Sequence, residues 1–244
     1  MKRIVFILLI LPFNVSASGN GQSLDVAPID LYDKESLQRG AENFANYCFN
    51  CHAISFMRFN RVAEDIGMTE DEVREKLMFT GAKYGDTMKI AMSGEDGKQW
   101  FGTPPPDLSV VSRSRGPNWL YTYLRSFYKD KERPWGVNNA IFKDVAMPHV
   151  LHELQGLQTA KYEARVGEDG SSHQFINGFE LTEKGKLSPV EFDRFVADLV
   201  NFLSYVGEPA KTTRLTLGKW VLGFLAVFFI VTYLLKKEYW KDVH

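Results

Sequence analysis

The stretch YCFNCHAISF, residues 47–56, contains both cysteines of the 244-residue chain, and a histidine directly follows the second cysteine. Cys48, Cys51 and His52 form the pattern C-x-x-C-H, by which c-type haem is attached to protein. Each thiol can add to one vinyl group of a porphyrin, and the two-residue gap allows both to reach the same ring. The imidazole of His52 can then bind the iron from one face. The motif therefore predicts one covalently bound haem c.

Three other interpretations of the cysteine pair compete with haem. A thioredoxin-like pair follows a strand and opens a helix, whereas the spacing of Leu37, Ala41 and Phe44 predicts a helix that runs into the motif. A disulfide between cysteines this close would close a very short loop and would stabilise the fold little. A zinc site would need two more ligands at finger-like spacing, and the next histidine is His149.

A six-coordinate haem needs a second axial ligand on the opposite face. Methionine is a soft thioether ligand that raises the reduction potential. Met147 stands directly before Pro148 in an irregular stretch, and the proline restricts the local backbone. Spacing alone makes Met147 the first candidate and leaves Met92, His149 and His152 as alternatives.

The N-terminus has the architecture of a secretory signal peptide. Lys2 and Arg3 precede an apolar run over residues 4–13, and Val-Ser-Ala follows at 15–17. The apolar run is too short to span a membrane, which takes about 20 residues. We therefore expect export of the chain and cleavage after Ala17, so that residues 1–17 are a signal peptide.

The C-terminal region carries a second membrane signal. Between Leu215 and Leu235 the only charged residue is Lys219, near the start. Twenty-one residues of helix, at about 1.5 Å each, span about 31 Å, close to the hydrocarbon thickness of a bilayer. We expect a transmembrane helix over 213–237, with membrane lipid around it.

Basic residues after this span predict its orientation. Lys236, Lys237 and Lys241 follow the apolar run, and basic residues stay on the cytoplasmic side. The tail 238–244 should therefore be cytoplasmic, and residues 18–212 should form a domain on the outer face of the membrane.

The exported part has helical periodicity, and we expect a mainly α fold with long loop insertions. Capping boxes begin two of the expected helices, at Thr69 with Glu72 and at Ser188 with Glu191, and Asn118 is expected to cap another. Long connections rich in proline and glycine are typical of loops wrapped around a non-protein group. The formal net charge of −1 gives no reason to expect a nucleic acid partner.

Further motifs resemble one haem protein family. They are PPDLS at 105–109, RSRG at 113–116, AMPH at 146–149 and NFLSYVGEPA at 201–210, directly before the predicted span. Together with C-x-x-C-H, their order resembles cytochrome c1, the membrane-anchored haem subunit of the ubiquinol:cytochrome c reductase, or bc1 complex. The similarity covers nearly the whole mature chain, including the bacterial type of tail.

The resemblance implies roles for particular residues of this chain. It implies that two cysteines form the thioether bonds, that a histidine and a methionine bind the iron, that an arginine pairs with a haem propionate, and that two prolines line the pocket. These residues are, in that order, Cys48 and Cys51, His52 and Met147, Arg115, and Pro105 and Pro106. A bidentate guanidinium suits a carboxylate such as a propionate.

The resemblance also implies partners and a location. It implies an electron carrier in the bacterial cytoplasmic membrane, with its haem domain on the periplasmic side. Cytochrome b would be its neighbour, the Rieske iron–sulfur protein its electron donor and a periplasmic cytochrome c its acceptor.

Two features of certain relatives are missing from this sequence. It lacks their strongly acidic insertion, and it has no second cysteine pair to stabilise the pocket. The nearest acidic cluster, over residues 64–75, is a weak docking candidate because basic residues interrupt it. Alternative functions are a free-standing membrane-anchored c-type cytochrome that serves another oxidase or reductase, a haem-based ligand sensor, and a thiol oxidoreductase without haem.

Overall fold

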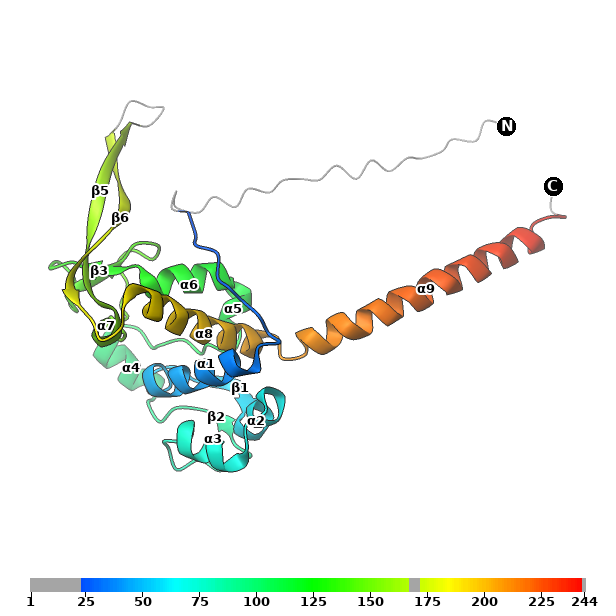
Figure 1. Cartoon of the computed structure of the whole chain (residues 1–244), viewed down its shortest axis with the longest axis horizontal. Helices are drawn as coiled ribbons and strands as arrows, with labels where there is room; N and C mark the ends of the chain where they lie inside the picture. Colours follow the sequence, from blue (N-terminus) through cyan, green and yellow to red (C-terminus); the bar gives the residue numbers. More distant parts are fainter. Residues whose placement is uncertain (1–22, 167–171, 243–244) are drawn as a thin grey trace.

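The computed structural model describes residues 23–166 and 172–242, and the predicted signal peptide lies outside these ranges. The helices are α1 (Lys34–Tyr47), α2 (Phe59–Ile66), α3 (Glu70–Lys76), α4 (Gly94–Phe101), α5 (Val111–Ser114), α6 (Pro117–Arg125), α7 (His152–Gln155), α8 (Pro189–Gly207) and α9 (Lys211–Tyr239). The strands are β1 (Ile54–Arg58), β2 (Thr87–Met88), β3 (Phe127–Lys129), β4 (Val137–Asn139), β5 (Gly156–Val166) and β6 (Ser172–Lys184). Helices α1 to α8 form one domain, from which α9 extends (Figure 1).

Helix α1 runs directly into the C-x-x-C-H motif, as the sequence predicted. It begins at Asp33, whose side chain accepts a hydrogen bond from the Ser36 amide at 2.9 Å. Its inner face buries Leu37, Ala41 and Phe44. The position of the motif is therefore set by the packing of this helix.

Helices α1 and α8 lie side by side in the core (Figure 1). Helix α8 begins with the predicted capping box of Ser188 and Glu191, and α3 begins with the predicted box at Thr69. At the contact, a Cβ on Gly40 would lie 2.1 Å from the carbonyl oxygen of Asp198. Only glycine permits two helix backbones to approach this closely.

The predicted cap at Asn118 was wrong. Helix α6 begins at Pro117 after Gly116, so the cap position falls before the asparagine. The Asn118 side chain instead accepts a hydrogen bond from the Ala27 amide at 2.9 Å, and Thr122 accepts one from the Asp25 amide. These contacts hold the segment before α1 against α6, a long-range use that local spacing did not predict.

A long β-hairpin qualifies the expectation of a mainly α domain. Strands β5 and β6 pair antiparallel from Gly156 with Lys184 to Val166 with Ser172, and the pairs β1–β2 and β3–β4 are much shorter. The hairpin projects from the helices (Figure 1). From Lys161 to Ala164 the β5 side chains are exposed on both faces, although polar and apolar residues alternate along this part of the strand.

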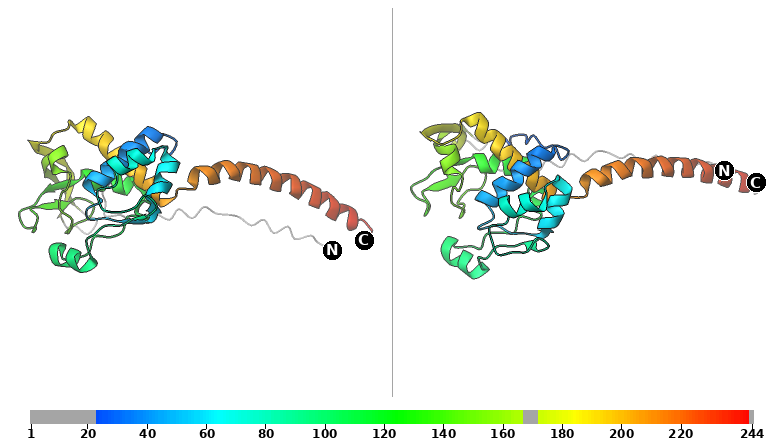
Figure 2. Two further views of the ribbon diagram at one scale, coloured as in Figure 1. Left: turned by 90° about the horizontal axis from the view of Figure 1, so that it is seen from below. Right: turned by 60° about the horizontal axis from the view of Figure 1, so that its bottom comes forward.

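Helix α9 projects from one end of the domain (Figure 2). In the part of the chain that the structure describes, it is the one helix long and apolar enough to cross a membrane, with a mean hydropathy of 2.0 over its most apolar window. No part of that window is buried against the domain. The helix includes the predicted span 213–237, and it fits a single transmembrane anchor.

Candidate functional site

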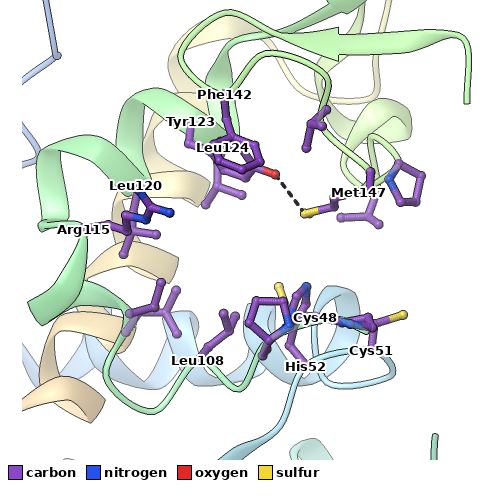
Figure 3. A pocket seen from close by; sticks show the side chains of 18 of the residues that line it. Cys48, Cys51, His52, Leu108, Arg115, Leu120, Tyr123, Leu124, Phe142 and Met147 are labelled. Atoms are coloured by element: carbon purple, nitrogen blue, oxygen red, sulfur yellow. Dashed lines mark hydrogen bonds between the residues drawn. The ribbon is translucent and has the colours of Figure 1, made fainter. Parts of the chain in front are cut away.

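One cavity of about 420 Å³ brings together the seven residues to which the family resemblance gives a role. They come from the end of α1 and the turn after it, the loop before α5, the C-terminal end of α5, and the loop between β4 and α7 (Figure 3). The named residues lining the cavity are Cys48, Cys51, His52, Pro105, Pro106, Arg115 and Met147. Most other lining residues are apolar, including Leu120, Leu124, Leu199 and Leu203.

His52 is oriented by a hydrogen bond on one ring nitrogen. Its Nδ1 lies 2.8 Å from the carbonyl oxygen of Pro106, and because a carbonyl only accepts, Nδ1 carries the proton. The other nitrogen, Nε2, then has its lone pair free for a metal ion. Burial lowers the pKa of His52, which also favours the neutral ring that metal binding needs.

The two cysteines lie on the same wall as His52 (Figure 3). No disulfide joins them, and burial, together with the neighbouring Cys51, raises the pKa of the Cys48 thiol to about 12. Burial also raises the pKa of Cys51. Thiol oxidoreductases instead rely on lowered cysteine pKa values, so the site does not favour that alternative.

Met147 lies across the cavity from this wall (Figure 3). Among the described residues, His52 and Met147 are the only histidine and methionine that line the cavity. His149 is instead 6% exposed and stacks on Phe127 with ring centroids 4.9 Å apart. Met92 and His152 also lie outside the cavity lining. The geometry thus favours Met147 over the alternatives that spacing left open.

Arg115 supplies a positive charge to a mostly apolar cavity. Its guanidinium lies over the rings of Trp119 and Phe142, at 5.2 and 5.8 Å from their centroids. Within the described ranges it has no carboxylate partner, whereas Arg113 pairs with Glu208 at 3.4 Å. Arg115 therefore fits an acidic group of a bound ligand, and Arg113 has a structural partner.

Sequence reasoning missed the polar network that shapes the Met147 loop. Asn139 donates to the Tyr123 carbonyl at 2.8 Å and accepts from the amides of Ile141 and Phe142. Asn138 accepts from the Asp144 amide at 2.9 Å. Adjacent asparagines in a loop are a signal for such side-chain-to-backbone bonds, because their amides mimic backbone turns.

The donor set fits haem c. Two thiols and an imidazole share one wall, a thioether sulfur faces them, a guanidinium can meet a propionate, and apolar side chains surround the remaining space. Prolines 105 and 106 form part of the wall, and the Pro106 carbonyl orients His52. A porphyrin with two vinyl groups and two carboxylates matches each of these features.

Asp107 ties the proline wall to the segment after the motif. Its carboxylate accepts hydrogen bonds from the amides of Ser109 at 2.8 Å and Ser55 at 3.0 Å. Burial raises the pKa of Asp107, but these hydrogen bonds lower it by more, so the net pKa is below the ordinary 3.8. The charged form is therefore favoured in the folded state.

Asp107→Asn should reduce the stability of the domain by about 1 kcal/mol at neutral pH, because a neutral amide replaces a charged acceptor of two amides. A depressed folded pKa contributes stability above the unfolded pKa of 3.8, and this stability is lost as the pH falls through the folded value. The difference in the free energy of unfolding between parent and variant should therefore shrink below pH 4. Urea unfolding at several pH values measures it, and equal stability at neutral pH would contradict the assignment.

Comparisons with known proteins agree with this site. The model of the Cytochrome C1 family matches residues 26–166 and 181–243. The chain is 50% identical to cytochrome c1 of Allochromatium vinosum, over the whole of both chains. It is 51% identical to a Nitrosomonas europaea protein named ammonia monooxygenase gamma subunit, covering 99% of that protein. It is also 24% identical to cytochrome b/c1 of Bradyrhizobium diazoefficiens, over 89% of this chain and 34% of that protein. The chain therefore belongs to the cytochrome c1 family of electron-transport haem proteins.

Proposed function

We propose that the chain carries electrons in a bc1 complex, from the Rieske iron–sulfur protein to a periplasmic cytochrome c. Family membership supports a haem subunit of such a complex. The observation that carries the proposal is the cavity in which Met147 faces Cys48, Cys51 and His52. An iron ligated on both faces suits electron transfer, because no open position is left for a substrate or a gas.

The chain's own residues have distinct tasks in this proposal. Cys48 and Cys51 would hold the porphyrin covalently, and His52 Nε2 and Met147 Sδ would hold the iron. Arg115 pairs with a propionate. When bound, the haem supplies a one-electron couple between ferric and ferrous iron. The protein contributes fixed ligands and an apolar cavity, so that little rearranges when the charge changes.

The proposed location follows from the two ends of the chain. Residues 1–17 direct export, residues 18–212 form the periplasmic domain, residues 213–237 span the membrane, and residues 238–244 are the cytoplasmic tail. The apolar side chains of α9 are exposed on all sides of the helix, which supports a membrane span. Lys236 and Lys237 in its last turn support the orientation.

Cytochrome b is the partner proposed within the membrane. The match to the relative named cytochrome b/c1 covers only 34% of that longer protein. Its name joins cytochrome b with cytochrome c1 in one chain, which supports cytochrome b as the neighbour of a c1 domain. The acidic cluster of residues 64–75 supports no docking role, because local contacts occupy several of its acids. Arg61 pairs with Asp65, Arg74 pairs with Glu70, and Glu72 belongs to the capping box of α3.

The test is purification of the tagged full-length chain from membranes of a bacterium that matures c-type cytochromes. We expect covalent haem on a denaturing gel, co-purification with cytochrome b, and reduction of the haem by added quinol. The double variant Cys48→Ala and Cys51→Ala should lose the covalent haem. Recovery with monooxygenase subunits in place of cytochrome b would overturn the proposed complex. Ready binding of carbon monoxide to the reduced protein would instead favour a ligand sensor.

A further inference from the structure

The Tyr123 hydroxyl donates a hydrogen bond to the Met147 sulfur, with oxygen and sulfur 3.4 Å apart (Figure 3). We propose that Tyr123 is a positioning residue that sets the orientation of this methionine and raises the reduction potential of the haem. The inference rests on the proposed role of Met147 as axial ligand. It adds a residue that no sequence motif pointed to.

Tyr123 is rigidly held where its hydroxyl meets the sulfur. Tyr123 is only 9% exposed. Its ring stacks on Trp119 at 4.8 Å with an interplanar angle of 11°, and the Phe127 ring packs edge-on against it at 5.2 Å. In the described part of the chain the hydroxyl has no other hydrogen-bond partner. A buried hydroxyl with a single partner loses a hydrogen bond outright if that partner moves away.

The loop that carries Met147 is fixed to the same residue of α6. The Asn139 side chain donates to the Tyr123 backbone carbonyl at 2.8 Å and is itself 1% exposed. Tyr123 thus contacts the loop between β4 and α7 through both its backbone and its side chain. No disulfide can hold this loop, since both cysteines of the chain are in the haem motif. Buried hydrogen bonds perform that task here.

The hydrogen bond also acts on the electrons of the sulfur. A thioether sulfur has two lone pairs and is a weak acceptor. One lone pair can bind iron while the other accepts the Tyr123 hydroxyl. The hydrogen bond draws electron density from the sulfur, and this weakens its donation to iron. Ferric iron depends on that donation more than ferrous iron does, so the hydrogen bond favours the ferrous state and raises the potential.

Tyr123→Phe removes the hydroxyl and keeps the ring, so it tests the hydrogen bond directly. We expect the equilibrium constant for reduction to fall three- to tenfold, which is about 28 to 59 mV for one electron. Tyr121→Phe is the matched control, because Tyr121 lies on the same helix, is 8% exposed and has its ring over Arg125. Redox titration of both variants in the full-length membrane protein gives the comparison. A change of less than twofold in Tyr123→Phe would overturn the inference.

The long-wavelength absorption band of thioether-bound ferric haem separates two kinds of failure. If the parent lacks this band, the proposed ligand Met147 is wrong. If the parent has it and Tyr123→Phe matches Tyr121→Phe in potential, only the role of Tyr123 is wrong. Should Tyr123→Phe not fold, proton NMR of the ferrous parent decides the question. A slowly exchanging Tyr123 hydroxyl proton close to the Met147 methyl group supports the inference, and a freely exchanging one contradicts it.

Discussion

Met147→His lowers the reduction potential by on the order of 0.3 V, a substantial part of the roughly 0.8 V that axial ligands control, and leaves the haem attached. Imidazole donates more strongly than a thioether and therefore stabilises ferric iron. The thioether bonds through Cys48 and Cys51 do not depend on Met147, so haem staining should persist. Electron transfer from quinol through the complex should stop, because the haem becomes too weak an oxidant. Redox titration and the loss of the thioether band measure the change.

Met92→His is the control for this substitution. Met92 lies outside the lining of the cavity, so the same change of residue type should leave the spectrum and the potential unaltered. Loss of the thioether band in Met92→His, with the band kept in Met147→His, would reverse the ligand assignment. His149 offers no substitute ligand in either variant, because it is stacked on Phe127 outside the cavity lining.

Gly40→Ala should destabilise the domain by about 3 kcal/mol or more and reduce the fraction of chains that keep haem. The added methyl would lie 2.1 Å from the Asp198 carbonyl oxygen and 2.7 Å from Phe202 Cβ. Neither contact is with the far end of a flexible side chain, so α1 and α8 would have to separate. Their separation would strain the bidentate pair of Arg39 with Asp198, whose carboxylate is nearly buried.

Gly94→Ala is the matched control for Gly40→Ala. Gly94 also lies in a helix, and no atom comes within 4 Å of the position that its Cβ would take. Because alanine has the higher helix propensity, both changes favour their helices locally by up to about 1 kcal/mol. A loss of stability only in Gly40→Ala then isolates the contact between α1 and α8. Urea unfolding of the haem-loaded protein measures it, and equal midpoints would contradict the predicted clash.

Local chemistry made part of this molecule predictable from its sequence. The capping boxes at Thr69 and Ser188 involve residues three apart, and the apolar face of α1 repeats at helical spacing. Both signals are contained within one element and so do not require knowledge of the fold. The C-x-x-C-H motif likewise specifies its chemistry within five residues.

Long-range contacts were not predictable in the same way. Asparagine is a residue type that often caps helices, yet the Asn118 side chain bonds to the Ala27 amide, 91 residues away. No motif in the sequence singles out Tyr123, and only the fold places Met147 beside its hydroxyl. Arg113 and Arg115 are two residues apart, yet Arg113 pairs with Glu208 whereas Arg115 lies over the rings of Trp119 and Phe142. In each case the deciding partner comes from a distant element.

The contact between α1 and α8 also determines how late in synthesis and export the domain can close. Arg39 and Asp198 are 159 residues apart, and α8 is the last helix before the apolar α9. In a chain that is exported N-terminus first, α1 emerges early and cannot close on α8 until almost the whole domain has crossed. Closure of so long a loop is a late and slow step in folding. In the proposed export, the cysteines would therefore stay accessible for haem attachment until α8, which contributes Leu199 and Leu203 to the cavity lining, packs against α1.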